Sequence, residues 1–246
     1  MWPLALASLA LLICPTLYAL VSCDPEALLA AASDPEVISA IGLSFATATA
    51  TALISLVLGT PLAYVLSRSG TRVRSALEAL LAIPVLLPHS AAGIAILSLL
   101  GPRSPLRPLA SYLVDKPLGI IAAQAFVSAP LLVFSARAAF DTVPVELELA
   151  ARSLGASRTK VFLWVSLPLA GKGILAGFLL TWARALSEFG AVVVLAYHPK
   201  TAPVLVYHRF LAWGLRGSQP VVVLLIIITS SILALLAAFG VRPYGG

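Results

Sequence analysis

Two charged residues interrupt a long apolar stretch in the last third of the sequence. Arg184 and Glu188 lie four residues apart between Gly173 and Pro199, where no other Lys, Arg, Asp or Glu occurs. A charge at mid-bilayer costs at least about 2.5–3.5 kcal/mol, so such side chains face other helices or a water-filled path. Two interpretations follow: an internal ion pair that holds helices together, or an anion pathway lined or braced by Arg184. A carboxylate would repel an anion, which favours a structural role for Glu188.

A histidine is a further candidate for contact with a charged substrate. His89 follows Pro88 at the start of another apolar stretch. A lone histidine there fits a hydrogen-bonded structural role or a place on the same pathway, since imidazole side chains change charge near neutral pH. The sequence contains no H-E-x-x-H, no cluster of Cys and His, and no G-x-S-x-G. We therefore expect no metal site and no catalytic residue in this chain.

The elements that must position these side chains are membrane helices. Of the 246 residues, 60% are hydrophobic and only 11% are charged, and the mean hydropathy is +1.03. An α-helix needs about 20 apolar residues to cross about 30 Å of hydrocarbon. The sequence therefore predicts an all-α membrane protein, one polytopic domain over residues 1–246 with six transmembrane helices. The predicted spans are about 2–21, 38–67, 78–100, 117–138, 171–197 and 218–240.

The distribution of basic residues indicates the orientation and accounts for the net charge of +6. One set of loops and ends between the six spans carries Arg68, Arg72, Arg74, Arg137, Arg152, Arg158, Lys160, Lys172 and Arg242. The other set carries Arg103, Arg107, Lys116, Lys200, Arg209 and Arg216. The richer set should be cytoplasmic, which puts both termini in the cytoplasm. No basic run is interleaved with aromatic residues, so nucleic-acid binding is not expected.

The two cysteines, Cys14 and Cys23, are not expected to pair. Nine residues apart on one helix they are separated by about 13 Å, too far for a disulfide. The letters "LVSC" ending at Cys23 resemble a lipoprotein cleavage box, but the N-terminus lacks the positive region of a signal peptide. We expect the first span to be retained, and whether Cys23 is modified stays open.

The most polar long segment is "ELELAARSLGASRTKVFLWVSLP", from Glu146 to Pro168. Pro144 fits a first helical position, and Gly155 fits the left-handed residue that follows a helix end. Ser157 can start a second helix. The segment therefore predicts two short helices separated by a glycine.

The first of these short helices is amphipathic. Glu148 and Arg152 are spaced to pair across one turn. The apolar face, at i, i+3, i+4 and i+7, is formed by Leu147, Ala150, Ala151 and Leu154. Such a helix either lies on the bilayer surface or contacts a soluble partner. The two small alanines favour close contact with a protein.

The same segment resembles the EAA loop of ABC importer permeases. The matching residues are Glu148, Ala150, Ala151, Gly155, Leu167 and Pro168. Leu149 departs from the pattern, because an alanine is usual there. The resemblance implies the type I importer permease fold, in which residues 143–168 form a cytoplasmic coupling loop. In the family this loop sits in a cleft on the ATPase and passes the motion of the ATPase to the membrane helices.

If ATP drives this protein, the sequence predicts that its hydrolysis takes place on another chain. A P-loop needs G-x-x-x-x-G-K followed by Ser or Thr. Gly171 and Lys172 have no glycine five positions earlier, and Gly173 follows them. Gly173 and Gly177 instead have small-xxx-small spacing, which is typical of helix packing in membranes. We therefore expect no cofactor on this chain and ATP on a partner subunit.

A second resemblance concerns the substrate and covers the chain from about Asp34 onward. The stretch "WARALSEFGAVVVLAYHPKTAPVLVYHRFLAWGL", with "IPVLLPHSAAGIA" and "LGTPLAYVLSR", is similar to permeases of molybdate/tungstate importers. Sulfate permeases are similar around "EFGAV", but the stretch that includes Tyr197 and Tyr207 resembles the molybdate/tungstate type more. The resemblance implies a homodimer of the permease in the plasma membrane, two cytoplasmic ATPase subunits and an extracellular oxyanion-binding protein.

Other functions remain as alternatives at this point. A sulfate/thiosulfate ABC permease is the nearest one. An ion-coupled secondary transporter would need acidic sites at mid-membrane and often two similar halves, but only Glu188 is a plausible coupling acid. An intramembrane enzyme would need a catalytic constellation that the sequence does not offer. Which residues contact the anion is left open.

Overall fold

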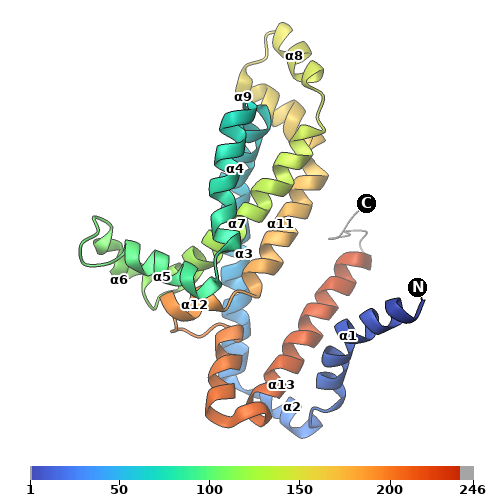
Figure 1. Ribbon diagram of the computed structural model, residues 1–246, viewed down its shortest axis with the longest axis vertical. Coiled ribbons are helices and arrows are strands. Elements are labelled where there is room, and N and C mark those ends of the chain that lie inside the picture. The colour runs from blue at the N-terminus through green and yellow to red at the C-terminus, as the bar shows by residue number, and fades with distance from the viewer. Residues whose placement is uncertain (1, 239–246) are drawn as a thin grey trace. The chain divides into compact units, whose positions relative to one another are not determined.

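The computed structural model describes residues 2–238, and every regular element in that range is helical (Figure 1). The all-α class is thereby confirmed. The elements are α1 (Trp2–Val21), α2 (Pro25–Ser33), α3 (Pro35–Arg68), α4 (Thr71–Leu86), α5 (His89–Leu99), η1 (Arg107–Leu109), α6 (Ala110–Leu113), α7 (Pro117–Asp141), α8 (Val145–Ser153), α9 (Arg158–Val161), η2 (Phe162–Ser166), α10 (Leu167–Leu169), α11 (Gly171–Leu186), α12 (Gly190–Leu195) and α13 (Ala202–Ala238). The element η1 is a 3₁₀ turn and η2 is a π-helical turn.

Within residues 2–238, four helices are long and apolar enough to cross a membrane, or up to six if each of two bent helix pairs is one span. Helices α1, α3 and α7 contain the spans predicted at 2–21, 38–67 and 117–138. Helix α13 contains the predicted span 218–240 as far as residue 238, and the last two residues of that prediction lie outside the described range. Long uncharged runs thus locate these helices well.

The predicted span 78–100 is not one continuous helix. The structure has α4 and α5 there, and their axes are bent by 109°. Leu87 and Pro88 adopt extended backbone between the two helices. Proline lacks the amide hydrogen that would bond one turn back, and it disfavours helical backbone at the residue before it. The proline therefore ends α4 although the surrounding residues are apolar.

The predicted span 171–197 is also interrupted. Helix α11 ends at Leu186 and α12 begins at Gly190. One carboxylate oxygen of Glu188 accepts a hydrogen bond from the backbone N of Ala191 at 2.8 Å. A side-chain acceptor at this place satisfies an amide of the new helix, so the chain can change direction without a buried, unpaired N–H.

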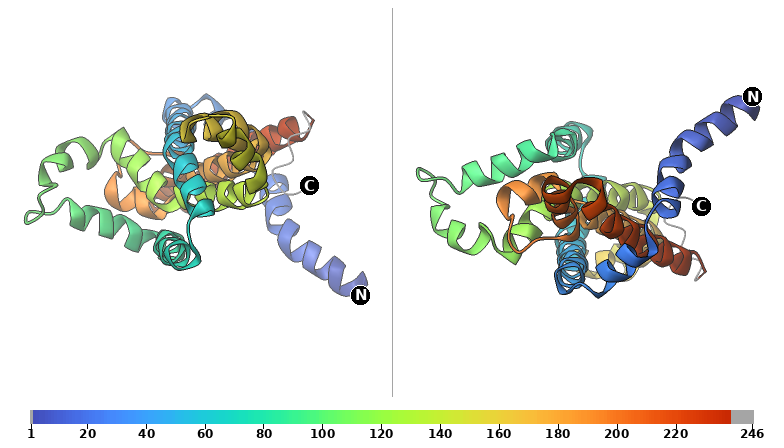
Figure 2. Two further views of the ribbon diagram at one scale, coloured as in Figure 1. Left: turned by 90° about the horizontal axis from the view of Figure 1, so that it is seen from above. Right: turned by 90° about the horizontal axis from the view of Figure 1, so that it is seen from below.

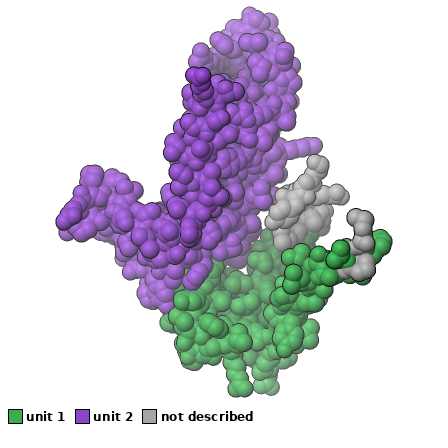
Figure 3. All heavy atoms as spheres, in the orientation of Figure 1, with its two compact units in different colours: residues 1–44, 200–241 green, residues 45–199, 242–246 purple. Residues whose placement is uncertain are grey.

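The chain forms two compact units, coloured separately in Figure 3. Unit 1 comprises residues 1–44 and 200–241. Its helices are α1, α2, the first turns of α3, and α13. Its buried apolar core consists of Val37, Ala40, Leu205 and Val221. The Asp34 carboxylate accepts from the backbone N of Glu36 at 2.8 Å, so Asp34 caps the start of α3.

Unit 2 contains residues 45–199 and holds all the candidate functional residues. Its bundle consists of α4, α7, α11 and the second part of α3, which run side by side with α8 beyond their ends (Figure 1). Helix α7 is central and buries eleven of its residues. Helices α5 and α6 project sideways from this bundle (Figure 2).

Close packing between α7 and α11 depends on two glycines. A Cβ atom at Gly173 would lie 2.4 Å from the Cβ of Ala139, and one at Gly177 would lie 2.9 Å from the Cβ of Ser135. Any larger residue would push the helices apart. The Ser135 hydroxyl also donates to the carbonyl of Gly173 at 2.9 Å. The helix-packing role predicted for this glycine pair is confirmed.

Candidate functional site

The segment that resembles a coupling loop folds locally as the sequence predicts. Helix α8 begins at Val145, one residue later than predicted, with Pro144 as its cap. Gly155 has φ +89°, the left-handed backbone expected after a helix end. The Ser157 hydroxyl accepts from the backbone N of Lys160 at 3.4 Å and starts α9. These local features depend on residue types that have strong backbone preferences.

Glu148, on α8, faces inward. Only 7% of Glu148 is exposed. Its carboxylate accepts hydrogen bonds from Arg68 Nη2 at 2.7 Å, Ser166 Oγ at 2.8 Å and Tyr64 Oη at 3.1 Å. These partners come from α3 and η2. They take the place of Arg152, the partner that the sequence predicted, because α8 turns its carboxylate toward the bundle end and leaves Arg152 exposed.

The surroundings of Glu148 keep its carboxyl ionised. Burial alone would raise the pKa of this carboxyl, but hydrogen bonds from Arg68, Ser166 and Tyr64 together outweigh burial and hold the pKa below its ordinary value. Arg68 donates through Nε as well as Nη2, so the ion pair is forked. Charge-assisted, forked bonds of this kind fix geometry better than single neutral bonds do. The ionised Glu148 carboxylate therefore ties α8 to the end of α3 and to η2.

The apolar side chains of α8 point away from this anchor. Leu147, Leu149 and Leu154 are 46%, 55% and 89% exposed. Of the two predicted motif alanines, Ala150 is exposed and Ala151 is half-buried. Helix α8 therefore buries its Glu148 carboxylate and exposes an apolar surface formed by its leucines. Leu167 and Pro168, the other motif residues, lie in α10 at the entrance to α11.

His89, Arg184 and Glu188 lie together in the structure. Arg184 Nη2 is 2.7 Å from Glu188 Oε2, and 2.9 Å and 3.1 Å from the two ring nitrogens of His89. The three residues come from α5, from the last turn of α11, and from the link to α12. The two helix breaks therefore bring one cation, one anion and one imidazole to a single place.

The three side chains differ in exposure, and this difference separates their roles. The side chain of Glu188 is fully buried, whereas those of Arg184 and His89 are 24% and 46% exposed. Glu188 divides its oxygens between Arg184 and the backbone N of Ala191. This arrangement supports a bracing role for Glu188. The guanidinium of Arg184 and the imidazole of His89 are the partly exposed groups of the cluster.

Sequence reasoning missed a buried glutamine beside this cluster. Gln124, on α7, is 1% exposed. Its Nε2 donates to the carbonyl of Ala185 at 3.0 Å, and its Oε1 accepts from Thr51 Oγ1 at 3.1 Å. One side chain therefore joins α3, α7 and the last turn of α11, next to Arg184. The signal available in the sequence was a single amide side chain within an otherwise apolar membrane span.

Replacing Gln124 by leucine should destabilise the folded protein. The substitution keeps the volume similar but leaves the Thr51 hydroxyl without this acceptor and removes one bond to Ala185. Interhelical polar bonds in membranes contribute about 0.6–1.7 kcal/mol each, so we expect a loss of roughly 1–3 kcal/mol. Thermal unfolding in detergent measures this loss. An unfolding temperature equal to the wild type would contradict the bridging role.

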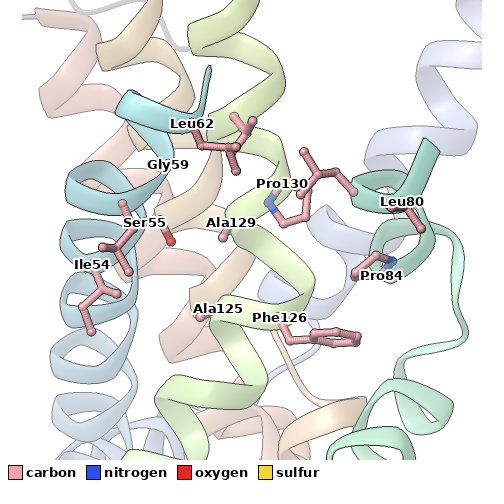
Figure 4. Close-up of a pocket in the computed structure, with 13 residues that line it drawn as sticks. Ile54, Ser55, Gly59, Leu62, Leu80, Pro84, Ala125, Phe126, Ala129 and Pro130 are labelled. Carbon is pink, nitrogen blue, oxygen red and sulfur yellow. The ribbon is translucent and has the colours of Figure 1, made fainter. Parts of the chain in front are cut away.

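One apolar cleft of unit 2 does not suit an anion. It has a volume of about 360 Å³ and lies between α3, α4 and α7 (Figure 4). Ser55 is the only polar side chain among the residues that line it. Pro84 of α4 and Pro130 of α7 lie on its wall. An oxyanion entering it would lose its hydration without gaining donors.

Among the described residues, no group of three or more His, Cys, Asp or Glu side chains is placed to hold a metal ion. The candidate functional residues of unit 2 thus lie in two polar groups, one around the Glu148 carboxylate and one formed by His89, Arg184 and Glu188.

Comparisons with known proteins agree with this geometry. Residues 55–242 match the family described as binding-protein-dependent transport system inner membrane component. The chain is 44% identical over 213 residues to the molybdate/tungstate transport system permease protein WtpB of Thermococcus kodakarensis, covering 87% of this chain and 83% of that protein. It is 40% identical over 222 residues to a probable molybdenum ABC transporter permease protein of Haloferax volcanii, covering 90% and 82%.

A more distant relative and a solved structure extend the comparison. The chain is 33% identical over 173 residues to a probable sulfate transport system permease protein of Marchantia polymorpha, covering 69% of this chain and 60% of that protein. A bacterial ABC transporter that imports the acidic polysaccharide alginate has a chain of similar fold, with a TM-score of 0.77 at 15% identity, covering 99% and 94%. This chain is a multi-pass membrane protein, and it belongs to the family of binding-protein-dependent transport system inner membrane components.

Proposed function

We propose that this chain is the permease subunit of an ATP-driven importer of tetrahedral oxyanions, with molybdate and tungstate as its substrates. The observation that carries the substrate is the 44% identity, over most of both chains, to a permease named for molybdate and tungstate. Relatives with the same name in Pyrococcus abyssi and Methanocaldococcus jannaschii are 45% and 40% identical. A sulfate permease is the second candidate, but the named sulfate relative is only 33% identical over a shorter stretch.

The coupling function is assigned to residues 143–168. Helix α8 exposes its leucines, and a soluble ATPase is the partner that such a cytoplasmic surface would suit. Glu148 anchors the same helix to α3 and η2. A surface that both contacts a partner and is fixed to the bundle can transmit force. ATP would be bound and hydrolysed on the separate ATPase subunit.

The anion pathway is assigned to the cluster around Arg184. Arg184 and His89 present partly exposed donors, and Glu188 lies buried behind them. Because Glu188 already balances the charge of Arg184, an anion would meet a nearly neutral site. Such a site binds weakly enough for the ion to leave, which suits passage better than storage.

The assembly is assigned from the family. Two copies of this chain, each with one coupling segment, would pair with two cytoplasmic ATPase subunits. An extracellular binding protein would deliver the anion, and both termini would lie in the cytoplasm. A structural relative supports the delivery step, because the alginate transporter has been solved in complex with an alginate-bound periplasmic protein.

Uptake into proteoliposomes tests the proposed function. The vesicles would contain this chain with its ATPase, and the binding protein would be added outside with labelled tungstate. We expect ATP-dependent uptake of labelled tungstate. Unlabelled molybdate should reduce this uptake, and sulfate at the same concentration should not. Competition by sulfate at comparable concentrations would move the chain to the sulfate permeases. If active partners give no ATP-dependent uptake of any of the three anions, the oxyanion assignment is wrong.

A further inference from the structure

The Glu148 carboxylate joins two separate segments of unit 2, because Arg68 and Tyr64 bind it from α3 and Ser166 binds it from η2. Arg68 is the last residue of α3, and Ser166 is the last residue of η2, which leads through α10 into α11. Resting on the function proposed above, we infer that Arg68 and Ser166 are positioning residues for transport. Arg68 carries the motion of α8 into α3, and Ser166 carries it into α11.

The link to α3 is rigid. The Nε atom of Arg68 lies 3.1 Å and 3.2 Å from the two carboxylate oxygens of Glu148, and Nη2 lies 2.7 Å from one of them. Nη2 also donates to the carbonyl of Val143 at 3.2 Å, and Nη1 donates to Ser67 at 3.0 Å. One planar guanidinium thus holds α8, the link before α8, and the end of α3 in a fixed geometry.

The link to α11 depends on one hydrogen bond, which the Ser166 hydroxyl donates. Ser166 is fully buried, and its Oγ lies 2.8 Å from Glu148 Oε1 but 3.5 Å from the carbonyl of Val161. A hydroxyl has one hydrogen to donate, and the shorter contact assigns it to the carboxylate. Removing this hydroxyl would therefore separate Glu148 from η2 while leaving the ion pair with Arg68 in place.

The backbone around Ser166 is suited to movement. Residues Phe162–Ser166 form a π-helical turn, a wider and rarer geometry that occurs often at functional sites. The segment Arg158–Leu169 then meets α11 at an angle of 76°. A shift of the π-helical turn would change how α11 enters the bundle, and the last turn of α11 carries Arg184. Helix α11 thus begins next to the segment that Ser166 ties to Glu148, and it ends at the charged cluster that contains Arg184.

The inference predicts that Ser166→Ala weakens coupling and leaves the fold intact. In the proteoliposome assay we expect tungstate transported per ATP hydrolysed to fall about tenfold, the size expected when a hydrogen bond to a charged group is lost. ATP hydrolysis itself should continue. Ser166→Thr keeps the hydroxyl and should restore most of the ratio. Ser128→Ala is the matched control, because Ser128 is equally buried and donates to the carbonyl of Gln124 on its own helix.

A readout that does not depend on the substrate separates this inference from the proposed function. With Cys14 and Cys23 replaced by serine, a single cysteine at the exposed position 187 reports on the break beside Arg184. In the otherwise unchanged assembly, we expect the rate at which this cysteine reacts with a maleimide to change when ATP is added. Ser166→Ala should abolish that change. This result would support the inference even if tungstate proved not to be the substrate.

The opposite results are equally clear. If Ser166→Ala keeps both the wild-type ratio of tungstate to ATP and the ATP-dependent labelling, the link through Ser166 does not carry motion, and the inference is wrong. If Ser128→Ala lowers the ratio as much as Ser166→Ala does, the effect is loss of a buried hydroxyl in general, and the inference is again wrong.

Discussion

Replacing Arg184 by glutamine is expected to lower ATP-driven tungstate uptake about a hundredfold, because a hydrogen bond between the guanidinium and the charged anion contributes about 1.5–3 kcal/mol. Arg184 lies in the last turn of α11, and its side chain is 24% exposed. The substitution also leaves the fully buried Glu188 without its counter-charge, which is destabilising by about 3–5 kcal/mol. Lower uptake alone could therefore come from loss of folded protein.

A double variant separates these two effects. Arg184→Gln with Glu188→Gln removes both charges, and the new amide at position 188 still offers an acceptor to the N–H of Ala191. We expect the yield of folded, detergent-stable protein to recover while uptake stays low. Uptake restored to the wild-type rate would show that Arg184 only balances Glu188 and does not serve the anion. Arg74→Gln is a control on α4, at an arginine paired with Glu78 and Asp141.

Replacing Glu148 by alanine should uncouple ATP hydrolysis from transport. Without the carboxylate, α8 loses its bonds to Arg68, Tyr64 and Ser166 at once. Bonds to charged groups contribute about 1.5–3 kcal/mol each, so we expect uptake to fall at least about tenfold. The protein should still insert in the membrane, since the apolar spans are untouched. Parallel assays of uptake, ATP hydrolysis and membrane content measure the three quantities.

The exposed Glu146 provides the comparison for this prediction. It lies in the first turn of the same helix, so Glu146→Ala removes an equal charge without touching the anchor. We expect near wild-type uptake from it. If Glu148→Ala transports tungstate normally, or if both variants behave alike, the coupling assignment of residues 143–168 fails.

Several features follow from residues that are close together in the sequence. The spans in α1, α3 and α7 are long uncharged runs. In a bilayer, a helix lets each such run satisfy the hydrogen bonds of its backbone within the segment itself. The cap at Asp34, the left-handed Gly155 and the start of α9 at Ser157 rest on preferences of single residues. The two short helices within residues 143–168 could be predicted for the same reason, since their pattern is local.

Contacts between distant segments could not be obtained in that way. Arg68 and Glu148 are 80 positions apart, and Thr51 and Gln124 are 73 apart. The sequence offered Arg152 as the partner of Glu148 because it is one turn away. In the tertiary structure Glu148 pairs with Arg68 instead, because α8 lies against the end of α3. The forked bond from Arg68 provides hydrogen bonds to the carboxylate while it stays buried.

The two helix breaks also separate what the local sequence determines from what the tertiary structure determines. Residues 78–100 and 171–197 are predominantly apolar, with few charged residues in either range, so hydropathy predicted unbroken spans. The structure ends α4 before Pro88 and α11 before Glu188, and the two ends meet where His89 can contact Arg184. Local composition thus decides which segments enter the membrane. Which polar groups come together inside the membrane depends on helix packing, because a buried charge is stable only where another helix supplies its partner.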